Sequence, residues 1–212
     1  MQKRTKPEVH RRTLIHFPII HTQMDMGGFS ETVREVTLRK LGGGAWKRKI
    51  SLVKQFWTDI GNAINGLDLP LKKTRLYQDG LPVCGREIDI VTELAGKGSP
   101  NHVLLQRLME KGAVLMGTES PALLIEEYRL MKEILESGDV REASRIEARQ
   151  KSASDTLLEK RDAYIAERID ATLKTGETGI LFLGILHKIE ERLPEDIHVL
   201  YPINRPVDQR GG

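Results

Sequence analysis

Polar residues that could do chemistry stand at the ends of four segments that the sequence predicts to be strands. They are His21 after the first strand, Asp79 after the second, Glu119 after the third and His187 after the fourth. Imidazole nitrogens and carboxylate oxygens can bind a divalent cation and leave a position for water, and the same groups can transfer a proton. If the four residues converge, the sequence therefore indicates a metal site or a proton-transfer site.

The elements that must position these residues are short apolar strands. They cover 13–20 ("TLIHFPII"), the first half of 73–82, 113–119, 179–186 and 197–203, and they alternate with segments of helical periodicity. This alternation is typical of a helix-rich α/β fold, in which helices cover both faces of a mainly parallel sheet. Ligands bind outside the carboxyl ends of the strands in such sheets. We therefore expect His21 and His187 to lie in one cleft.

Apolar residues at helical spacing predict the helices between these strands. The predicted helical segments are 30–70, 87–98, 101–112 and 121–175. Gly42-Gly43-Gly44 is expected to end the first helix of the first segment, because successive glycines disfavour a helix. Residues 140–174 form either one long helix or a helix pair, and a charged, helix-like segment at 187–196 precedes the last strand.

The composition excludes several classes of protein. Charged residues make up 30% of the 212 residues and aromatic residues 5%, which is typical of a helix-rich soluble protein. Lysine and arginine number 33 against 30 aspartate and glutamate, an excess too small to indicate nucleic acid or an anionic membrane as a partner. Cys84 is the single cysteine, so the chain has no internal disulfide and no thiolate metal cluster.

The same observations set the expected organisation of the chain. We expect a single α/β domain over residues 1–212, with residues 1–12 flexible. No apolar run approaches the length of a membrane span, so we expect a cytoplasmic protein without a membrane partner. The expected partner is a small-molecule or peptide ligand, and a homo-oligomer is compatible with the sequence.

Each histidine also has a purely structural interpretation. A histidine at a strand end or a helix start is commonly held by a hydrogen bond and takes no part in chemistry. We weigh this interpretation equally with a functional role for His187, and we favour it for His16, His102 and His198.

The two carboxylates have structural interpretations as well. Asp79 is followed by Gly80, and formation of a turn is a sufficient explanation for this pair. Glu119 can simply lie near the N-terminus of the helix that begins at Pro121, where exposed amides favour a carboxylate. These residues indicate a functional site only if the strand ends that carry them come together in the fold.

A charged pair interrupts the apolar stripe of the last predicted helix. Leu158, Ile165 and Ile169 recur at helical spacing, but Arg161 and Asp162 occupy the turn between the first two. Charges on a buried face are costly unless they find partners. Arg161 therefore either reaches a carboxylate or an anionic ligand, or extends from the edge of the stripe into solvent.

The C-terminal part of the chain carries two features of a known family. They are an Arg-containing helix, "RDAYIAERIDATL", and a strand that ends in Gly184-Ile185-Leu186-His187. With Pro18-Ile19-Ile20-His21 near the N-terminus, these features resemble the TraB, or pheromone-shutdown, family. That family is grouped with the TIKI Wnt-cleaving proteases, the erythromycin esterases and the ChaN haem-binding proteins. Gln78-Asp79 takes the place of the glutamate that its members carry after their second strand. The resemblance implies an α/β fold with a paired-histidine site and metal-dependent hydrolysis.

Two hypotheses about function follow. In the first, the chain is a metal-dependent hydrolase that holds one divalent cation. Its metal ligands are His21 and His187, with Asp79 or Asp25 to complete the shell. Glu119 then takes the proton of the attacking water, and Arg161 stabilises the developing oxyanion. In the second, a binding protein of the same fold holds an anion or a planar, porphyrin-like ligand without turnover. The metal content of the purified protein discriminates between them.

Overall fold

The sheet has five strands, all parallel. The computed structural model describes residues 11–19, 30–137 and 139–203, and within these ranges the strand order is β3-β2-β4-β1-β5. The strands are β1 (Arg12–Ile19), β2 (Thr74–Gln78), β3 (Val114–Met116), β4 (Thr178–Gly184) and β5 (Ile197–Leu200). Each one overlaps a segment that the sequence predicts to be a strand.

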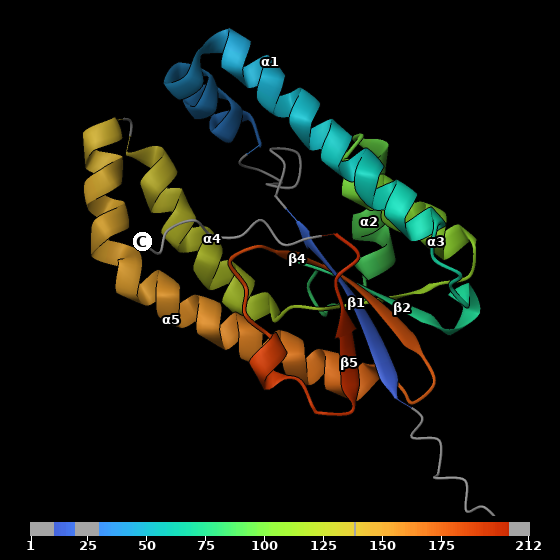
Figure 1. Ribbon diagram of the computed structural model, residues 1–212. Helices are drawn as coiled ribbons and strands as arrows, with labels where there is room; N and C mark the ends of the chain where they lie inside the picture. The colour runs from blue at the N-terminus through green and yellow to red at the C-terminus, as the bar shows by residue number, and fades with distance from the viewer. Residues whose placement is uncertain (1–10, 20–29, 138, 204–212) are drawn as a thin grey trace, which may run out of the picture.

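Helices cover both faces of this sheet (Figure 1). One face carries α1 (Ser30–Asn65), α2 (Glu87–Gly96) and α3 (Pro100–Glu110). The other carries α5 (Val140–Thr172), and α4 (Pro121–Glu136) packs along α5. The α/β fold with a parallel sheet between helical layers is therefore confirmed. Among the described residues, no helix is both long enough and apolar enough to cross a membrane.

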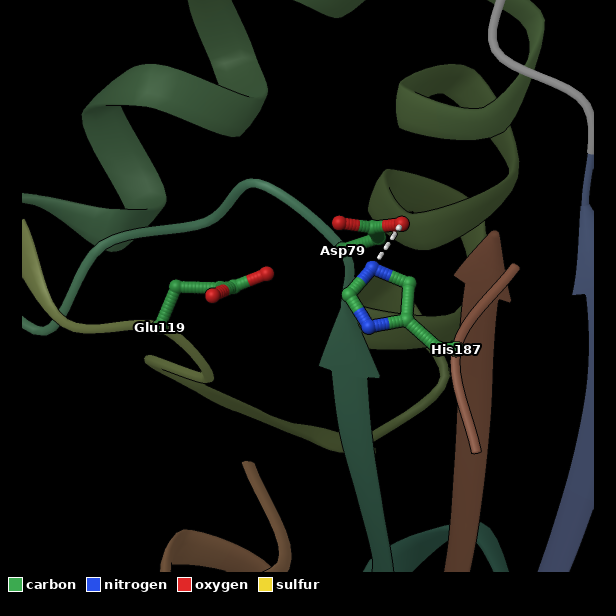
Figure 2. Close-up of side chains that lie close together, drawn as sticks. All are labelled: Asp79, Glu119 and His187. Atoms are coloured by element: carbon green, nitrogen blue, oxygen red, sulfur yellow. Dashed lines mark ion pairs between the residues drawn. The ribbon is translucent and has the colours of Figure 1, made fainter. Parts of the chain in front are cut away.

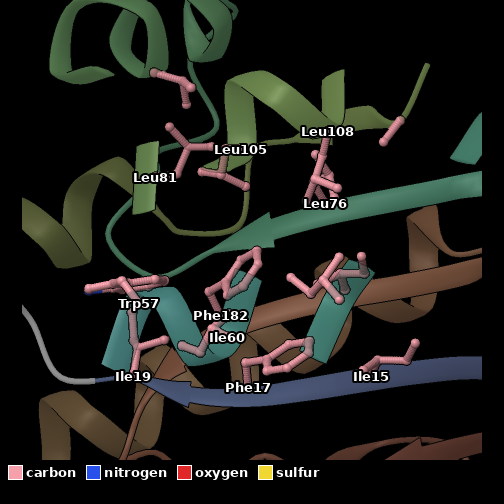
Figure 3. Close-up of a cluster of buried hydrophobic side chains, with 14 residues drawn as sticks. Ile15, Phe17, Ile19, Trp57, Ile60, Leu76, Leu81, Leu105, Leu108 and Phe182 are labelled. Carbon is pink, nitrogen blue, oxygen red and sulfur yellow. The ribbon is translucent and has the colours of Figure 1, made fainter. Parts of the chain in front are cut away.

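The period-2 pattern of the strands divides the core into two clusters. Phe17 of β1 faces α1 and stacks on Phe182 of β4, with 5.6 Å between ring centroids, and Trp57 of α1 lies 6.1 Å from Phe182 (Figure 3). Leu14 points to the opposite face and packs with Ile165 of α5. Each such buried side chain contributes about 1.5–3 kcal/mol, so both helical layers are anchored on the sheet.

Two helices are longer than the sequence predicts. The structure assigns α1 as helical through Gly42-Gly43-Gly44, so the expectation that this triplet ends a helix is wrong. Each interior glycine costs only about 1 kcal/mol relative to alanine, and packing of Trp57, Ile60 and Ile64 on the sheet exceeds that cost. Of the two alternatives for 140–174, the single helix is observed as α5.

Arg12 contradicts the expectation that residues 1–12 are flexible. Residues 1–10 lie outside the described residues, but Arg12 begins β1 and is only 8% exposed. Its guanidinium forms ion pairs of 2.7 Å with Asp170 and Asp196. Arg12 therefore ties β1 to the end of α5 and to the segment before β5, and it is not part of a flexible segment.

The apolar run 113–119 predicts a buried strand and the segment 187–196 predicts a helix, and the structure differs from both expectations. Val114 of β3 is 41% exposed, because β3 lies at the edge of the sheet and has one neighbouring strand. The segment 187–196 contains only a single 3-10 turn, η3 (Glu190–Arg192). Leu193 is extended, as expected for a residue before Pro194, and this stops a helix there. Gly138 follows the periodic run 122–137, where a glycine is expected to end the helix, but it lies outside the described residues.

The strand order identifies one position in the sheet where a ligand can enter. The connection that leaves β2 leads outward to β3, whereas the connection that leaves β4 leads past β1 to β5 on the opposite side. Connections that diverge in this way leave a crevice at the carboxyl ends of the two strands. Asp79 follows β2 and His187 follows β4, so both lie at this crevice.

Candidate functional site

Asp79 bridges the two strands at the crevice. Its backbone N–H donates to the Phe182 carbonyl at 2.9 Å, and its Oδ2 accepts the Gly184 N–H at 2.8 Å. Gly80 follows with a φ of 75°, a conformation that favours glycine, so the predicted turn is present. The Asp79 carboxylate is nevertheless buried, and a turn by itself does not explain a buried charge.

Glu119 is brought to the same place by the loop between β3 and α4. Its backbone N–H donates to the Leu81 carbonyl at 2.9 Å, and its carbonyl accepts the Val83 N–H at 2.9 Å. The side chain is fully buried, and its hydrogen bonds go to Arg161 and the Gly80 N–H. Burial raises the pKa of Glu119, Arg161 opposes the shift, and Asp79 adds to it.

Arg161 points inward from α5 and binds three carboxylates. Its Nη2 lies 2.7 Å from Asp79 Oδ1 and 2.5 Å from Glu119 Oε1, and its Nε donates to Glu119 Oε2 at 3.1 Å. Nη1 donates to Glu127 of α4. Burial opposes its positive charge, but Glu119, Asp79 and Glu127 more than compensate and raise the pKa of Arg161. The interruption of the apolar stripe is thus explained by buried ion pairs, and extension into solvent is wrong.

His187 is held between the carboxylates of Asp162 and Asp79, and Figure 2 shows its ion pair with Asp79. Its Nδ1 lies 2.5 Å from Asp162 Oδ1, and its Nε2 lies 3.5 Å from Asp79 Oδ2. Asp162 Oδ2 also accepts the Lys188 N–H at 2.9 Å, so Asp162 fixes both the ring and the backbone beside it. Burial lowers the pKa of His187, but the hydrogen bonds with Asp162 and Asp79 outweigh burial and raise it to about 9.

The described residues of this cluster carry an excess of negative charge. Among them two groups can be positive, the Arg161 guanidinium and the His187 imidazole, and they face the buried carboxylates of Asp79, Glu119 and Asp162 and the partly exposed carboxylate of Glu127. Four carboxylates against two cations leave two negative charges when all groups are ionised. Buried charges are stable only when compensated, so the cluster favours a further cation or a proton on one carboxyl group.

Three of these residues form a group that could hold a metal ion. Asp79, Glu119 and His187 are buried, and one ligand atom of each lies within 4.8 Å of the others. The 3.5 Å between His187 Nε2 and Asp79 Oδ2 is too long for a strong hydrogen bond. It suits two ligands of one ion, each bound at about 2.1 Å. A carboxylate has about four acceptor positions, so Arg161 and a cation can share Asp79 and Glu119.

A pocket of about 520 Å³ opens beside this group. Asp79, Arg161 and His187 lie along its polar side, and Glu127 lines it from α4. Its apolar wall comes from α2, α4, α5 and the loop after β4, with Ile90, Leu94, Leu124, Met131, Leu158, Ile185 and Leu186. The volume falls in the range of small-molecule sites, about 300–1,000 Å³.

The structure brings together four of the six residues that the sequence nominates. Asp79, Glu119 and His187 form the group that could hold a metal, and Arg161 binds the first two. His21 and Asp25 lie outside the described residues. Convergence of the strand ends after β2, β3 and β4 is therefore observed, while the pairing of His21 with His187 stays a prediction.

Sequence reasoning missed three residues of the site. Asp162 was visible as half of the charged pair in the stripe, but nothing in the sequence indicates that it reaches His187. Glu127 carries no sequence signal, because it is one of many charged residues on an exposed helix. His102 of α3, interpreted as structural, lies 2.7 Å from Ser99 Oγ through its Nδ1 and also lines the pocket.

Known proteins give no relative with which this site can be compared at a significant level. No family model matches the chain, and neither curated proteins nor solved structures give a significant match.

Proposed function

We propose that the protein is a metal-dependent hydrolase whose divalent cation is held by Asp79, Glu119 and His187. The observation that carries this proposal is the orientation of His187. Asp162 accepts a hydrogen bond from Nδ1, so Nε2 is the nitrogen that faces Asp79 and the pocket, and it would bind the cation once the ring loses its second proton. Metal-binding histidines characteristically donate their second nitrogen to a carboxylate in this way.

The chain's own residues take distinct roles in this proposal. A divalent cation at this place would lower the pKa of a bound water and polarise the scissile group. Asp162 sets the tautomer and direction of His187, and Arg161 holds Asp79 and Glu119 in place and opposes the rise in the pKa of Glu119. Because each guanidinium nitrogen already binds a carboxylate, Arg161 acts as a positioning residue in this proposal. Stabilisation of an oxyanion by Arg161 would first require one of these pairs to open.

Membership of a TraB-like family is part of the same proposal and rests on the sequence alone. The Gly184-Ile185-Leu186-His187 motif supplies the histidine that faces Asp79. The "RDAYIAERIDATL" helix supplies Arg161 and Asp162. The proposal predicts that His21 adds a second imidazole to the cation.

Binding without turnover is the second candidate function, and the apolar pocket supports it. A planar or elongated apolar ligand would be enclosed by α2, α4 and α5 beside the polar cluster. An anionic ligand is less well supported, because Arg161 and His187 are already paired with carboxylates. Turnover of a model ester separates the two candidates.

Calorimetric titration of metal-free protein with Zn²⁺ and Mn²⁺ tests the proposal. Wild-type protein should bind one ion, and His187→Ala and Asp79→Asn should weaken binding at least about tenfold. His198→Ala is the matched control, because His198 is exposed on β5. Hydrolysis of p-nitrophenyl butyrate should follow metal loading and disappear with a chelator. Equal metal binding by wild type and His187→Ala would reject the metal site. Metal binding without hydrolysis would favour the second candidate.

A further inference from the structure

The pocket has a definite chemical preference that follows from its charges. Among the described residues, Asp79 and Glu127 line it directly, and the cationic groups on its surface, Arg161 and His187, are each bound to carboxylates. Arg161 presents no nitrogen that lacks a carboxylate partner. An anion entering here would have to displace one of these carboxylates or lie next to it.

A bound divalent cation would not remove the excess of negative charge around the pocket. Within the described part of the chain, and with His187 neutral as a ligand, one guanidinium and one divalent cation would face the four carboxylates of Asp79, Glu119, Glu127 and Asp162. One negative charge then remains. Electrostatic exclusion of anions is therefore expected both with and without metal, and like-charge contact is strongly unfavourable in a partly buried site.

The rest of the pocket is built for an apolar body. Leu124, Met131 and Leu158 line its α4–α5 side, and Ile90 and Leu94 line the α2 side. At its mouth two large apolar residues of the loop after β4, Ile185 and Leu186, are 45% and 72% exposed. Exposed apolar residues gathered around a concave site indicate a surface that a ligand covers.

We propose that this pocket binds small molecules that have an apolar body and no negative charge. For substrates, this proposal rests on the proposed hydrolase function, and the pocket should then prefer neutral esters or amides to phosphate esters and carboxylates. For binding alone, the same preference should be seen in metal-free protein. His102, which lines the α3 side, is a polar group that can orient such a ligand.

Two fluorescent probes with nearly the same apolar body test this preference. N-phenylnaphthylamine is neutral, and anilinonaphthalene sulfonate adds one sulfonate. Metal-free wild-type protein should bind the neutral probe at least about tenfold more tightly, a ratio equivalent to about 1.4 kcal/mol. Glu127→Gln removes a carboxylate from Arg161 Nη1, so it should raise the affinity for the sulfonate probe relative to the affinity for the neutral probe. Equal or tighter binding of the sulfonate probe by wild type would overturn the proposal.

Filling variants show whether the probes bind in this pocket. Leu158→Trp and Leu124→Trp, from α5 and α4, should each weaken the neutral probe at least about tenfold. Leu52→Trp is the matched control, because Leu52 is 71% exposed on α1 and does not line the pocket. If both filling variants fold and bind the probe like wild type, the pocket assignment is wrong. Metal titration tests the metal site separately, so the proposed ligand preference and the proposed metal site can be rejected independently of each other.

Discussion

Asp162 and His187 form one unit although 25 residues separate them in the chain. Asp162 Oδ1 lies 2.5 Å from His187 Nδ1, and Asp162 Oδ2 accepts the Lys188 N–H at 2.9 Å. One carboxylate of α5 thus determines the ring's tautomer and also its position at the end of β4. The direction of Nε2 toward Asp79 depends on this contact.

Asp162→Asn should therefore weaken metal binding without touching a metal ligand. Loss of a carboxylate behind a ligating histidine typically lowers metal affinity about 10–100-fold. Asp155→Asn is the control, because Asp155 lies on α5 and its side chain is 61% exposed. Zn²⁺ titration of the two variants gives the comparison. If Asp162→Asn and Asp155→Asn bind Zn²⁺ equally, the orienting role of Asp162 is wrong.

The stability of the metal-free protein should depend on pH through His187. Its pKa is raised from 6.5 in the unfolded chain to about 9 in the fold. The stabilising contribution is therefore fully present below about pH 6.5 and is lost as pH rises through about 9. It amounts to at most about 3 kcal/mol.

Urea unfolding of wild type and His187→Gln between pH 6 and pH 10, with chelator present, measures this effect. The difference in unfolding free energy between the two proteins should be largest at the acidic end and shrink toward alkaline pH. A difference that stays constant over the range would mean that His187 is not protonated in the fold.

The sequence predicts the sheet and the strand ends well, because both depend on local patterns. Apolar runs followed by a polar residue identify Asp79 and His187 without any knowledge of strand order. The partner of Arg161 was predictable as a class, since a charge within an apolar stripe requires compensation. Glu127 was not predictable, because it reaches Arg161 only through the packing of α4 on α5.

Local patterns also gave wrong expectations at two places. Glycine propensity suggested a break within α1, although packing of distant apolar residues decides whether that helix continues. Basic residues at the N-terminus suggested flexibility, although Arg12 finds Asp170 and Asp196 from the far end of the chain. The structural interpretation of His102 agrees with its burial and its hydrogen bond to Ser99, and only the fold shows that it also lines the pocket.

Arg161→Met should destabilise the protein strongly. It leaves Asp79 and Glu119 buried without their main counter-charge, and removal of one member of a buried ion pair costs about 3–5 kcal/mol. Arg145→Met is the control on the same helix, because the Arg145 side chain is 78% exposed and its loss should cost less than about 0.5 kcal/mol. Equilibrium unfolding in urea gives both values.

A compensating variant distinguishes lost charge pairing from lost packing. Arg161→Met combined with Glu119→Gln removes one of the uncompensated charges, so it should recover part of the stability lost in Arg161→Met alone. Coupling of this kind between contacting residues is typically about 0.5–3 kcal/mol. If the two substitutions are additive, Arg161 stabilises the fold through packing and the charge pairing contributes little.

Gly117→Ala should displace Glu119 from the site by a backbone effect. A Cβ at Gly117 would lie 2.8 Å from Val83 Cα and 2.8 Å from Glu87 Oε1, so the loop must shift. Glu119 is two residues further along this loop, where it is held by hydrogen bonds to Leu81 and Val83. Overpacking of this kind costs about 1–3 kcal/mol, and the shift should also lower Zn²⁺ affinity. Gly61→Ala is the matched glycine substitution, because a Cβ at Gly61 meets no atom within 4 Å and α1 is helical there. It should raise stability by about 1 kcal/mol and leave Zn²⁺ binding unchanged.

Urea unfolding and Zn²⁺ titration of Gly117→Ala and Gly61→Ala measure both effects. Unchanged Zn²⁺ affinity in Gly117→Ala would show that Glu119 is not a metal ligand positioned by this loop.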